Sequence, residues 1–229
     1  MDMETLKNIL TCNYIWPRYC TEYSWGGFSF ALPMACFCDI PLSQISEHIN
    51  FYGNYGIGLS KAWSERIKEL SSVLYVKTKS HIGNHVAYCL RKNQQNLDKL
   101  SKEDFIILSR IKKYSGNARN KDGKTVSKIF YNEREWRYVP SDLEPKDLYV
   151  RHGNDRIEIE ESKNIKFKEK LHFRLSDIKY LIISKESERV SFLKTLEKIY
   201  CKNNSANIDE NFLLLASKII TCEQIKKDF

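Results

Sequence analysis

The sequence predicts an α+β fold, in which a single domain holds a mixed or split β-sheet with flanking helices. Short β-prone runs are separated by stretches of helical spacing, without the strict strand–helix–strand rhythm of α/β proteins. The chain has 229 residues, 42% of them hydrophobic, which is enough to bury a substantial core. We therefore expect residues 1–229 to form one domain.

The N-terminal part is expected to alternate between helices and strands. Leu6, Ile9 and Leu10 have helical spacing, whereas Pro17 and the glycine pair at 26–27 indicate loop and turn. Ser60 is a suitable helix cap. The expected elements are a helix at 3–10, a strand at 34–40, a helix opened by Pro41, a strand at 57–60 and a helix at 61–70.

The rest of the chain is expected to begin with a strand at residues 73–76 and a helical stretch from 81 to 113. A basic, glycine-containing loop at 114–125 follows. The later elements are expected to be strands at 157–160, 171–173 and 180–184, a helix at 190–200, a linker at 203–209 and a last strand at 213–220.

Positive charge is concentrated in one part of the chain. Residues 77–128 contain 13 Lys or Arg against four acidic residues, while the whole chain carries +8. We interpret residues 79–128 as a basic helical and loop insertion that favours a polyanion such as nucleic acid. The alternative is an ordinary solvated surface. The residues expected to contact nucleic acid are Lys112, Lys113, Arg119, Lys121, Lys124 and Lys128.

Cysteine usage and hydropathy indicate a reduced, cytoplasmic protein. Of the seven cysteines only Cys36 and Cys38 lie close together, and no CxxC or HxxxH unit completes a zinc set. We therefore expect no metal and interpret Cys36 as a core thiol. The N-terminus lacks the pattern of a secretory leader. No apolar run reaches the roughly 18–20 residues of a membrane span, so no membrane partner is expected.

Two glutamates form the most informative pattern of the chain. Glu133 and Glu135 lie two residues apart in an aromatic, β-prone run, so on one strand both carboxylates would face one cleft. Like charges on one strand face repel, which is unusual for a purely structural strand. Arg134, Arg137 and Tyr138 could order the carboxylates by charge-assisted hydrogen bonds. The alternative is a half-exposed edge strand whose charges face water.

Four stretches carry a resemblance to a known family. They are residues 6–22, the segment CFCDIPL at 36–42, the segment YGNYGIGLSKAW at 52–63 and the segment YNEREWR at 131–137. In this order they resemble AbiGi, a bacterial abortive-phage-resistance family that carries an antitoxin label. The resemblance extends to residues 215–220 and 225–229. It implies antiviral defence and a cognate toxin or antitoxin partner.

The run from Glu135 to Val139 and Pro140 is also similar to DarT-type ADP-ribosyltransferases, whose catalytic glutamate lies in a strand ending in an apolar-Val-Pro sequence. This second resemblance implies an ADP-ribosyltransferase-like fold with NAD as substrate. Glu135 would then be catalytic, stabilising oxocarbenium-like charge on the ribose. Glu133 would be the upstream member of the pair and would deprotonate or orient the acceptor.

The same resemblance implies a site for NAD. Tyr52, Tyr55 and Trp63 would stack on nicotinamide or adenine, and Arg18 would hold the pyrophosphate. The alternatives are tyrosines at the edge of the core and an arginine in a solvated loop. Such enzymes carry a histidine upstream of the first helix, but here no histidine precedes His48. Either Arg18 or His48 replaces it, or NAD binding is lost.

Two functions therefore stay open on the sequence. One is an ADP-ribosyltransferase-like effector that modifies nucleic acid or protein. The other is a catalytically silent antitoxin that neutralises a partner toxin, such as a nucleotidyltransferase. Motifs of other enzyme classes, namely a G-x-S-x-G elbow, a P-loop and a G-x-G-x-x-G turn, do not occur.

Overall fold

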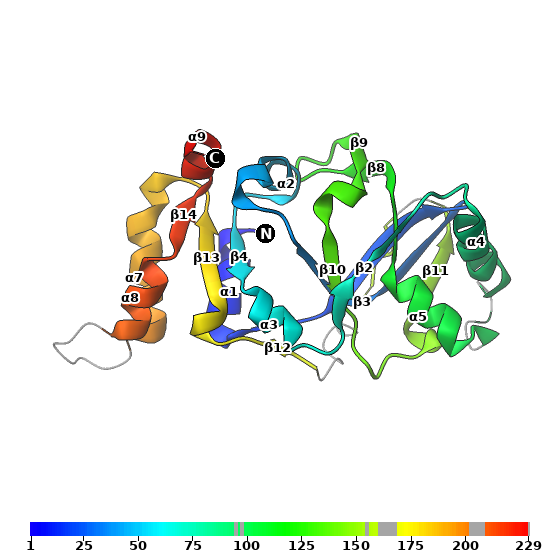
Figure 1. The fold of residues 1–229 in the computed structure, drawn as a ribbon, viewed down its shortest axis with the longest axis horizontal. Coiled ribbons are helices and arrows are strands. Elements are labelled where there is room, and N and C mark those ends of the chain that lie inside the picture. Colours follow the sequence, from blue (N-terminus) through cyan, green and yellow to red (C-terminus); the bar gives the residue numbers. More distant parts are fainter. Residues whose placement is uncertain (94–95, 97–98, 154–155, 160–168, 202–208, 229) are drawn as a thin grey trace.

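The computed structural model is an α+β structure in which helices surround several small sheets (Figure 1). It describes the chain except residues 94–95, 97–98, 154–155, 160–168, 202–208 and 229. The helices are α1 (Met3–Cys12), α2 (Ser46–Tyr52), α3 (Lys61–Glu65), α4 (His81–Asn93), α5 (Lys102–Arg110), α7 (Arg189–Tyr200), α8 (Glu210–Ala216) and α9 (Cys222–Asp228).

The strands within the described residues are mostly short and form five sheets. They are β1 (Tyr14–Ile15), β2 (Arg18–Trp25), β3 (Phe28–Cys38), β4 (Gly56–Leu59), β5 (Leu70–Ser72), β6 (Leu74–Val76), β7 (Ile111–Lys113), β8 (Ser115–Arg119), β9 (Thr125–Ile129), β10 (Glu135–Tyr138), β11 (Tyr149–His152), β12 (Leu171–His172), β13 (Ile178–Ile183) and β14 (Ile219–Thr221). Two short 3-10 helices matter below, η1 (Leu42–Gln44) and η3 (Phe130–Glu133).

The long strand β3 organises the main sheet. It pairs antiparallel with β2, β10 and β11, and β10 pairs in turn with β5. The register sets Arg137 opposite Cys36 and Glu22 opposite Phe30. Because side chains alternate along a strand, Glu22 and Arg137 project from the same face of the sheet. Residues far apart in sequence are thereby brought together.

Each face of the main sheet has its own core. One face carries Phe30 and Leu32, which pack with residues of α4 and α5 such as Val86 and Leu108. The opposite face packs against a second core in which Leu6, Ala35, Tyr138, Leu181 and Phe192 come from α1, β3, β10, β13 and α7. Burying a side chain of this size contributes roughly 1.5–3 kcal/mol, so these two cores hold the layers together.

A second sheet has the order β14-β13-β4. Strand β13 pairs antiparallel with β4 and parallel with β14. Parallel neighbours need a long crossover connection, and helices α7 and α8 lie in the connection from β13 to β14. The apolar run at residues 213–220 was expected to be a strand, which is wrong for its first half. It forms the end of α8 and reaches the sheet only at Ile219.

The basic segment at residues 114–125 was expected to be a loop, but it forms most of the antiparallel β8–β9 hairpin. The side-chain oxygen of Asn120 closes the turn by accepting from the amides of Asp122 at 3.1 Å and Lys124 at 2.9 Å. Gly123 supplies the positive φ of 78° that this turn needs. The strands were missed because both faces are polar, so the usual apolar alternation is absent.

Several local expectations are confirmed. Helix α1 and helix α7 lie close to the expected bounds, and Ser60 caps α3 by accepting from the Trp63 amide at 3.1 Å. Helix α3 nevertheless ends at Glu65, and residues 18–25 form β2 where loop was expected. The expected strand at 157–160 is irregular as far as residue 159. Residue 160 and most of the expected linker at 203–209 lie outside the described residues.

Candidate functional site

Six charged side chains form a network that links β2, β7, β9 and β10. Three are carboxylates and three are cations, so the network is neutral within itself. We refer to it as the ionic network, and its members are Glu22, Lys112, Lys128, Glu133, Glu135 and Arg137.

Arg137 is the centre of the ionic network and is completely buried. Its guanidinium donates to Glu22 Oε1 at 2.5 Å and to Glu135 Oε1 at 2.7 and 3.0 Å. It also donates to the carbonyl oxygens of Ser109 at 3.1 Å and Ile111 at 3.4 Å. The planar guanidinium suits this use, since its donors reach several acceptors in one plane. The expected ordering of a carboxylate by Arg137 is confirmed.

Glu135 has both carboxylate oxygens occupied by cations. Oε1 accepts from Arg137, while Oε2 accepts from Lys112. Burial by itself would raise the pKa of Glu135, but Arg137 and Lys112 outweigh it and hold the pKa at about 2. In the same way, burial would lower the pKa of Lys112, yet Glu22, Glu135 and Glu133 hold it well above its ordinary value. Glu135 and Lys112 are therefore both charged at neutral pH.

Glu133 and Glu135 do not lie on one strand, so this expectation is wrong. Glu133 ends the 3-10 helix η3, and Glu135 begins β10. Arg134 between them adopts a left-handed conformation with φ 45°, which breaks the strand and turns the chain. The two carboxylates still converge, because Lys112 Nζ contacts Glu135 and lies 3.5 Å from Glu133 Oε2.

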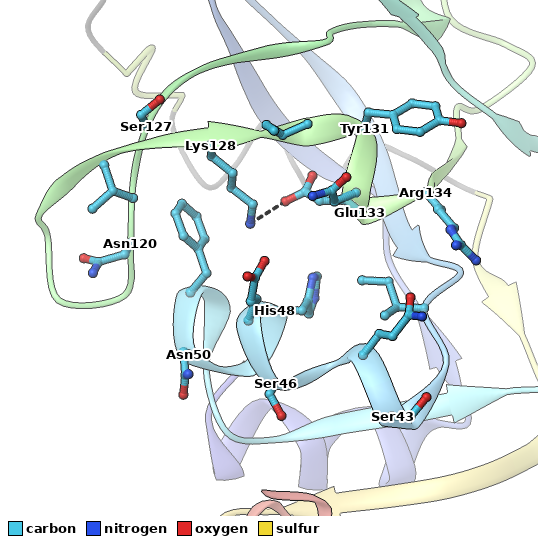
Figure 2. A pocket seen from close by; sticks show the side chains of 17 residues that line it. Ser43, Ser46, His48, Asn50, Asn120, Ser127, Lys128, Tyr131, Glu133 and Arg134 are labelled. Carbon is cyan, nitrogen blue, oxygen red and sulfur yellow. Dashed lines mark ion pairs between the residues drawn. The ribbon is translucent and has the colours of Figure 1, made fainter. Parts of the chain in front are cut away.

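Glu133 lies at the side of the ionic network that opens toward a pocket. Its Oε1 is 2.8 Å from Lys128 Nζ and also accepts a hydrogen bond from the Tyr52 hydroxyl. Figure 2 shows this ion pair facing helix α2. The pocket between the hairpin and that helix has a volume of about 960 Å³. Lys128 also lies over the rings of Phe51 and Tyr52, at 3.7 and 4.4 Å from their centroids.

His48 lines the same pocket with a neutral imidazole. It comes from α2 and packs against the ring of Tyr52, with a centroid separation of 4.6 Å and an interplanar angle of 41°. Burial lowers the pKa of His48 to about 4, against the opposing effect of Glu133. Its buried Nδ1 has no hydrogen-bond partner among the described residues. Among the described residues, the pocket thus contains one buried nitrogen without a hydrogen-bond partner, His48 Nδ1, near Glu133, whose charge is paired with Lys128.

A larger cleft of about 1860 Å³ opens beside this pocket and shares His48 and Glu133 with it. Glu22 and Glu135 also lie on its wall. Cys36 and Cys38, interpreted from the sequence as buried thiols, are exposed and line the cleft. The reason is their place at the end of β3, where burial gives way to exposure after Ala35.

The residues expected to bind NAD are held in different ways. Trp63 is 2% exposed and donates from its indole nitrogen to the His172 carbonyl at 2.9 Å. Tyr55 donates to Glu188, whereas Tyr52 donates to Glu133. All three aromatic residues line the cleft, while Arg18 is exposed and is not among the described residues that line it. Their role with NAD stays a prediction.

The residues expected to contact nucleic acid divide into two groups. Lys112 and Lys128 belong to the ionic network, and Lys113 is buried. The other three, Arg119, Lys121 and Lys124, are exposed on the β8–β9 hairpin. The backbone amide of Lys121 donates to the Phe51 carbonyl at 2.8 Å, which holds the hairpin against α2. Only this second group is presented to a partner.

Sequence reasoning missed Glu22 as a member of the site. It lies 115 residues before Arg137 and belongs to a segment that was expected to be loop. The one available signal was a carboxylate among the aromatic and β-prone residues of β2, the same kind of pattern that drew attention to Glu133 and Glu135.

Comparison with known proteins identifies the family. The model of the family described as "Putative abortive phage resistance protein AbiGi, antitoxin" matches residues 15–184, which span all members of the ionic network. This chain belongs to the AbiGi family. A curated relative, "Abortive phage resistance protein AbiGi" from Lactococcus lactis subsp. cremoris, is 30% identical over 228 residues, covering 86% of this chain and 89% of the relative.

AbiGi membership places the chain among abortive-phage-resistance proteins, as the sequence resemblance implied. No solved structure matches it significantly, and the expected likeness to an ADP-ribosyltransferase fold finds no support there. Within the described residues, every helix is too short or too polar to cross a membrane.

Proposed function

We propose that this chain is the antitoxin of an abortive-infection pair and acts by binding its cognate toxin protein. The observation that carries the proposal is the state of Glu133 and Glu135. A carboxylate that stabilises positive charge on a substrate needs a free face toward that substrate. Here Glu135 is 2% exposed, and both of its oxygens are already neutralised by Arg137 and Lys112. The pattern that suggested catalysis serves the fold instead. The antitoxin description of the matching family supports the same function.

The β8–β9 hairpin is the surface that we assign to the toxin. Arg119, Lys121 and Lys124 are exposed along it, and Val126 and Ile129 add exposed apolar area on β9. A rim of cations beside apolar side chains suits an acidic partner, because the charges steer association and the apolar groups supply contact. The hairpin is also held to α2 through Lys121 and Lys128, so it presents a pre-organised surface.

The competing function is NAD-dependent ADP-ribosyl transfer. The observation in its favour is the cleft of about 1860 Å³, which is large compared with pockets that bind small molecules and is lined by Tyr52, Glu133 and Glu135. For this function the ionic network would have to open when substrate binds. Such a step would release Glu135 from two cations.

The test is rescue of growth. The cognate toxin would be co-expressed with the parent, with the double variant Lys121→Glu/Lys124→Glu, or with the control Lys194→Glu/Lys198→Glu on exposed positions of α7. We expect the parent and the control to restore growth and the hairpin variant to fail. In purified form, the hairpin variant should associate at least about tenfold more slowly with the toxin.

Three outcomes would contradict parts of this proposal. Full rescue by the hairpin variant would remove the hairpin from the interface. Absence of both rescue and binding by the parent would overturn the antitoxin function. Consumption of NAD by the purified parent would favour the competing function. Glu135→Gln is a poor test of catalysis, since it takes one of two carboxylate partners from the buried Arg137 and is expected to destabilise the fold.

A further inference from the structure

A second cluster of side chains lies on the helical layer, away from the ionic network. His85 and Cys89 are one turn apart on α4, so they share one helix face. Asp104 comes from the first turn of α5 and reaches the same point. His85 Nε2 lies 3.3 Å from Asp104 Oδ1 and 3.4 Å from Cys89 Sγ. The three ligand atoms all lie within 4.8 Å of one another.

These spacings are those of ligands around a tetrahedral zinc ion. Zinc lies about 2.0–2.1 Å from nitrogen, about 2.0–2.2 Å from oxygen and about 2.3 Å from sulfur, which at tetrahedral angles separates nitrogen from oxygen by about 3.3 Å and nitrogen from sulfur by about 3.5 Å. The two distances from His85 agree with these values. A metal ion would therefore need little movement of the imidazole.

His85 Nε2 faces both a carboxylate oxygen and a sulfur, and the Cys89 thiol also makes a side-chain hydrogen bond to Asp104, so the three groups meet at one point. Without an ion, the ring N–H and the thiol S–H can both donate to the carboxylate. A cation at the centre would bind all three atoms at once. No metal was expected from the sequence because no CxxC or HxxxH unit completes a zinc set. His81 and His85 do form an HxxxH pair, but Asp104 comes from a different helix and joins His85 and Cys89 only in the fold.

We propose that His85, Cys89 and Asp104 form a zinc-binding site between α4 and α5, a property separate from the proposed antitoxin function. One nitrogen, one thiolate sulfur and one carboxylate oxygen make a ligand set that suits this borderline-soft ion. Cys89 is 4% exposed, whereas the side chains of His85 and Asp104 are 55% and 33% exposed. The ion can thus enter from solvent, and a fourth position stays open for water or for a donor from a partner.

The effect of zinc would be to join the two helices that cover the main sheet. Val86 and Leu90 of α4 pack in the same core as Phe105 and Leu108 of α5. A bond from each helix to one ion would add a link at the solvent side of this core. Because the ion binds the folded chain, it should stabilise the helical layer by an amount that rises with the logarithm of its concentration above the Kd.

The experiment uses the full-length chain, stripped of metal with a chelator and then titrated with cobalt and zinc. Cobalt reports both geometry and sulfur ligation. We expect one cobalt per chain, tetrahedral d–d bands and a thiolate charge-transfer band, all abolished when zinc displaces cobalt. Zinc should also raise the Tm of the parent.

Three variants and one control identify the ligands. Cys89→Ser should remove the charge-transfer band, and His85→Gln and Asp104→Asn should each weaken zinc binding by at least about tenfold, the lower end of what even supporting residues cost. His85 is exposed, so His85→Gln should fold even if Cys89→Ser does not. The control Cys36→Ser/Cys38→Ser removes the thiol pair of the cleft and should leave the band unchanged.

Several results would overturn the proposal. One is a parent that shows no cobalt spectrum and no rise in Tm with one equivalent of zinc. A second is a charge-transfer band that survives in Cys89→Ser or disappears in the Cys36→Ser/Cys38→Ser control. A third is octahedral cobalt without sulfur ligation, which would indicate an adventitious surface ion only.

Discussion

Replacing Arg137 by methionine is the sharpest test of how the ionic network contributes to the fold. Arg137 is fully buried, and its removal leaves Glu22 without its closest cation and Glu135 with Lys112 alone. The carbonyl oxygens of Ser109 and Ile111 lose a donor as well. Breaking one side of a buried ion pair costs about 3–5 kcal/mol, so we expect a loss of about 4 kcal/mol.

This loss is large against the roughly 5–15 kcal/mol that stabilises an ordinary domain. With a urea m-value of about 2 kcal/mol/M, it corresponds to a fall of about 2 M in the unfolding midpoint. Equilibrium unfolding in urea at pH 7, followed by circular dichroism, measures it. The matched control is Arg151→Met, because Arg151 is an exposed strand arginine in the same sheet. That variant should differ from the parent by no more than about 0.5 kcal/mol.

A double variant separates charge from packing. Arg137→Met combined with Glu135→Gln removes a buried cation together with a buried anion, so it should cost less than the sum of the two single changes by about 0.5–3 kcal/mol. If Arg137→Met lowers stability by less than 1 kcal/mol, or raises it, the interpretation of the network as a structural necessity is refuted.

Three further predictions concern His48, the cap of α3 and two glycines. The pKa of His48 is about 4 in the folded chain and 6.5 otherwise, so the folded state loses stability as the pH falls from 6.5 toward 4. His48→Gln should therefore make the urea unfolding midpoint less dependent on pH in that window. Equal slopes of midpoint against pH for parent and variant would contradict this. Ser60→Ala should cost about 1 kcal/mol in urea unfolding through loss of the α3 cap, and no loss would show that the cap is dispensable. Gly26 and Gly123 both have positive φ, but a Cβ at Gly26 would lie 2.5 Å from Ala87 Cβ whereas one at Gly123 meets nothing within 4 Å. Gly123→Ala should therefore lower the free energy of unfolding by about 1–2 kcal/mol through its backbone conformation alone. Gly26→Ala should cost about 1–3 kcal/mol more because of the clash with Ala87, and equal urea midpoints for the two variants would contradict this.

Local signals in the sequence predicted local structure. Helix α1 follows from the spacing of Leu6 and Leu10, and the start of α3 follows from Ser60. The hairpin could not be predicted in the same way, because its apolar residues Val126 and Ile129 fall on opposite faces and give no apolar alternation. Strand β2 was missed because Pro17 and the glycine pair at 26–27 indicated loop and turn, although the spacing of Tyr19, Tyr23 and Trp25 in the sequence is typical of a strand. Helix α8 was mistaken for a strand because a short apolar run fits either element until its neighbours are known.

The site was predicted only in part, for a comparable reason. The spacing of Glu133 and Glu135 drew attention to two carboxylates that prove to be buried, but their function depends on what surrounds them. Lys112 lies more than twenty residues upstream, Glu22 lies on another strand, and no pattern in one sequence pairs them. Arg134 adds a second difficulty, since its left-handed conformation converts an apparent strand into a turn. Whether a carboxylate is free or paired with cations is decided by the tertiary structure.

The ionic network also sets the earliest point in synthesis at which strands β2 and β10 can be joined by their charges. Glu22 cannot form its ion pair until Arg137 has been synthesised, which is 115 residues later, or roughly 6–23 s at ordinary elongation rates. The wait at the N-terminus is longer, since the Tyr200 hydroxyl donates to the Leu10 carbonyl across 190 residues. The nascent chain therefore holds Glu22 without Arg137 for about half of its synthesis. Codon usage and chaperone supply should consequently influence how much active protein a cell obtains from each transcript.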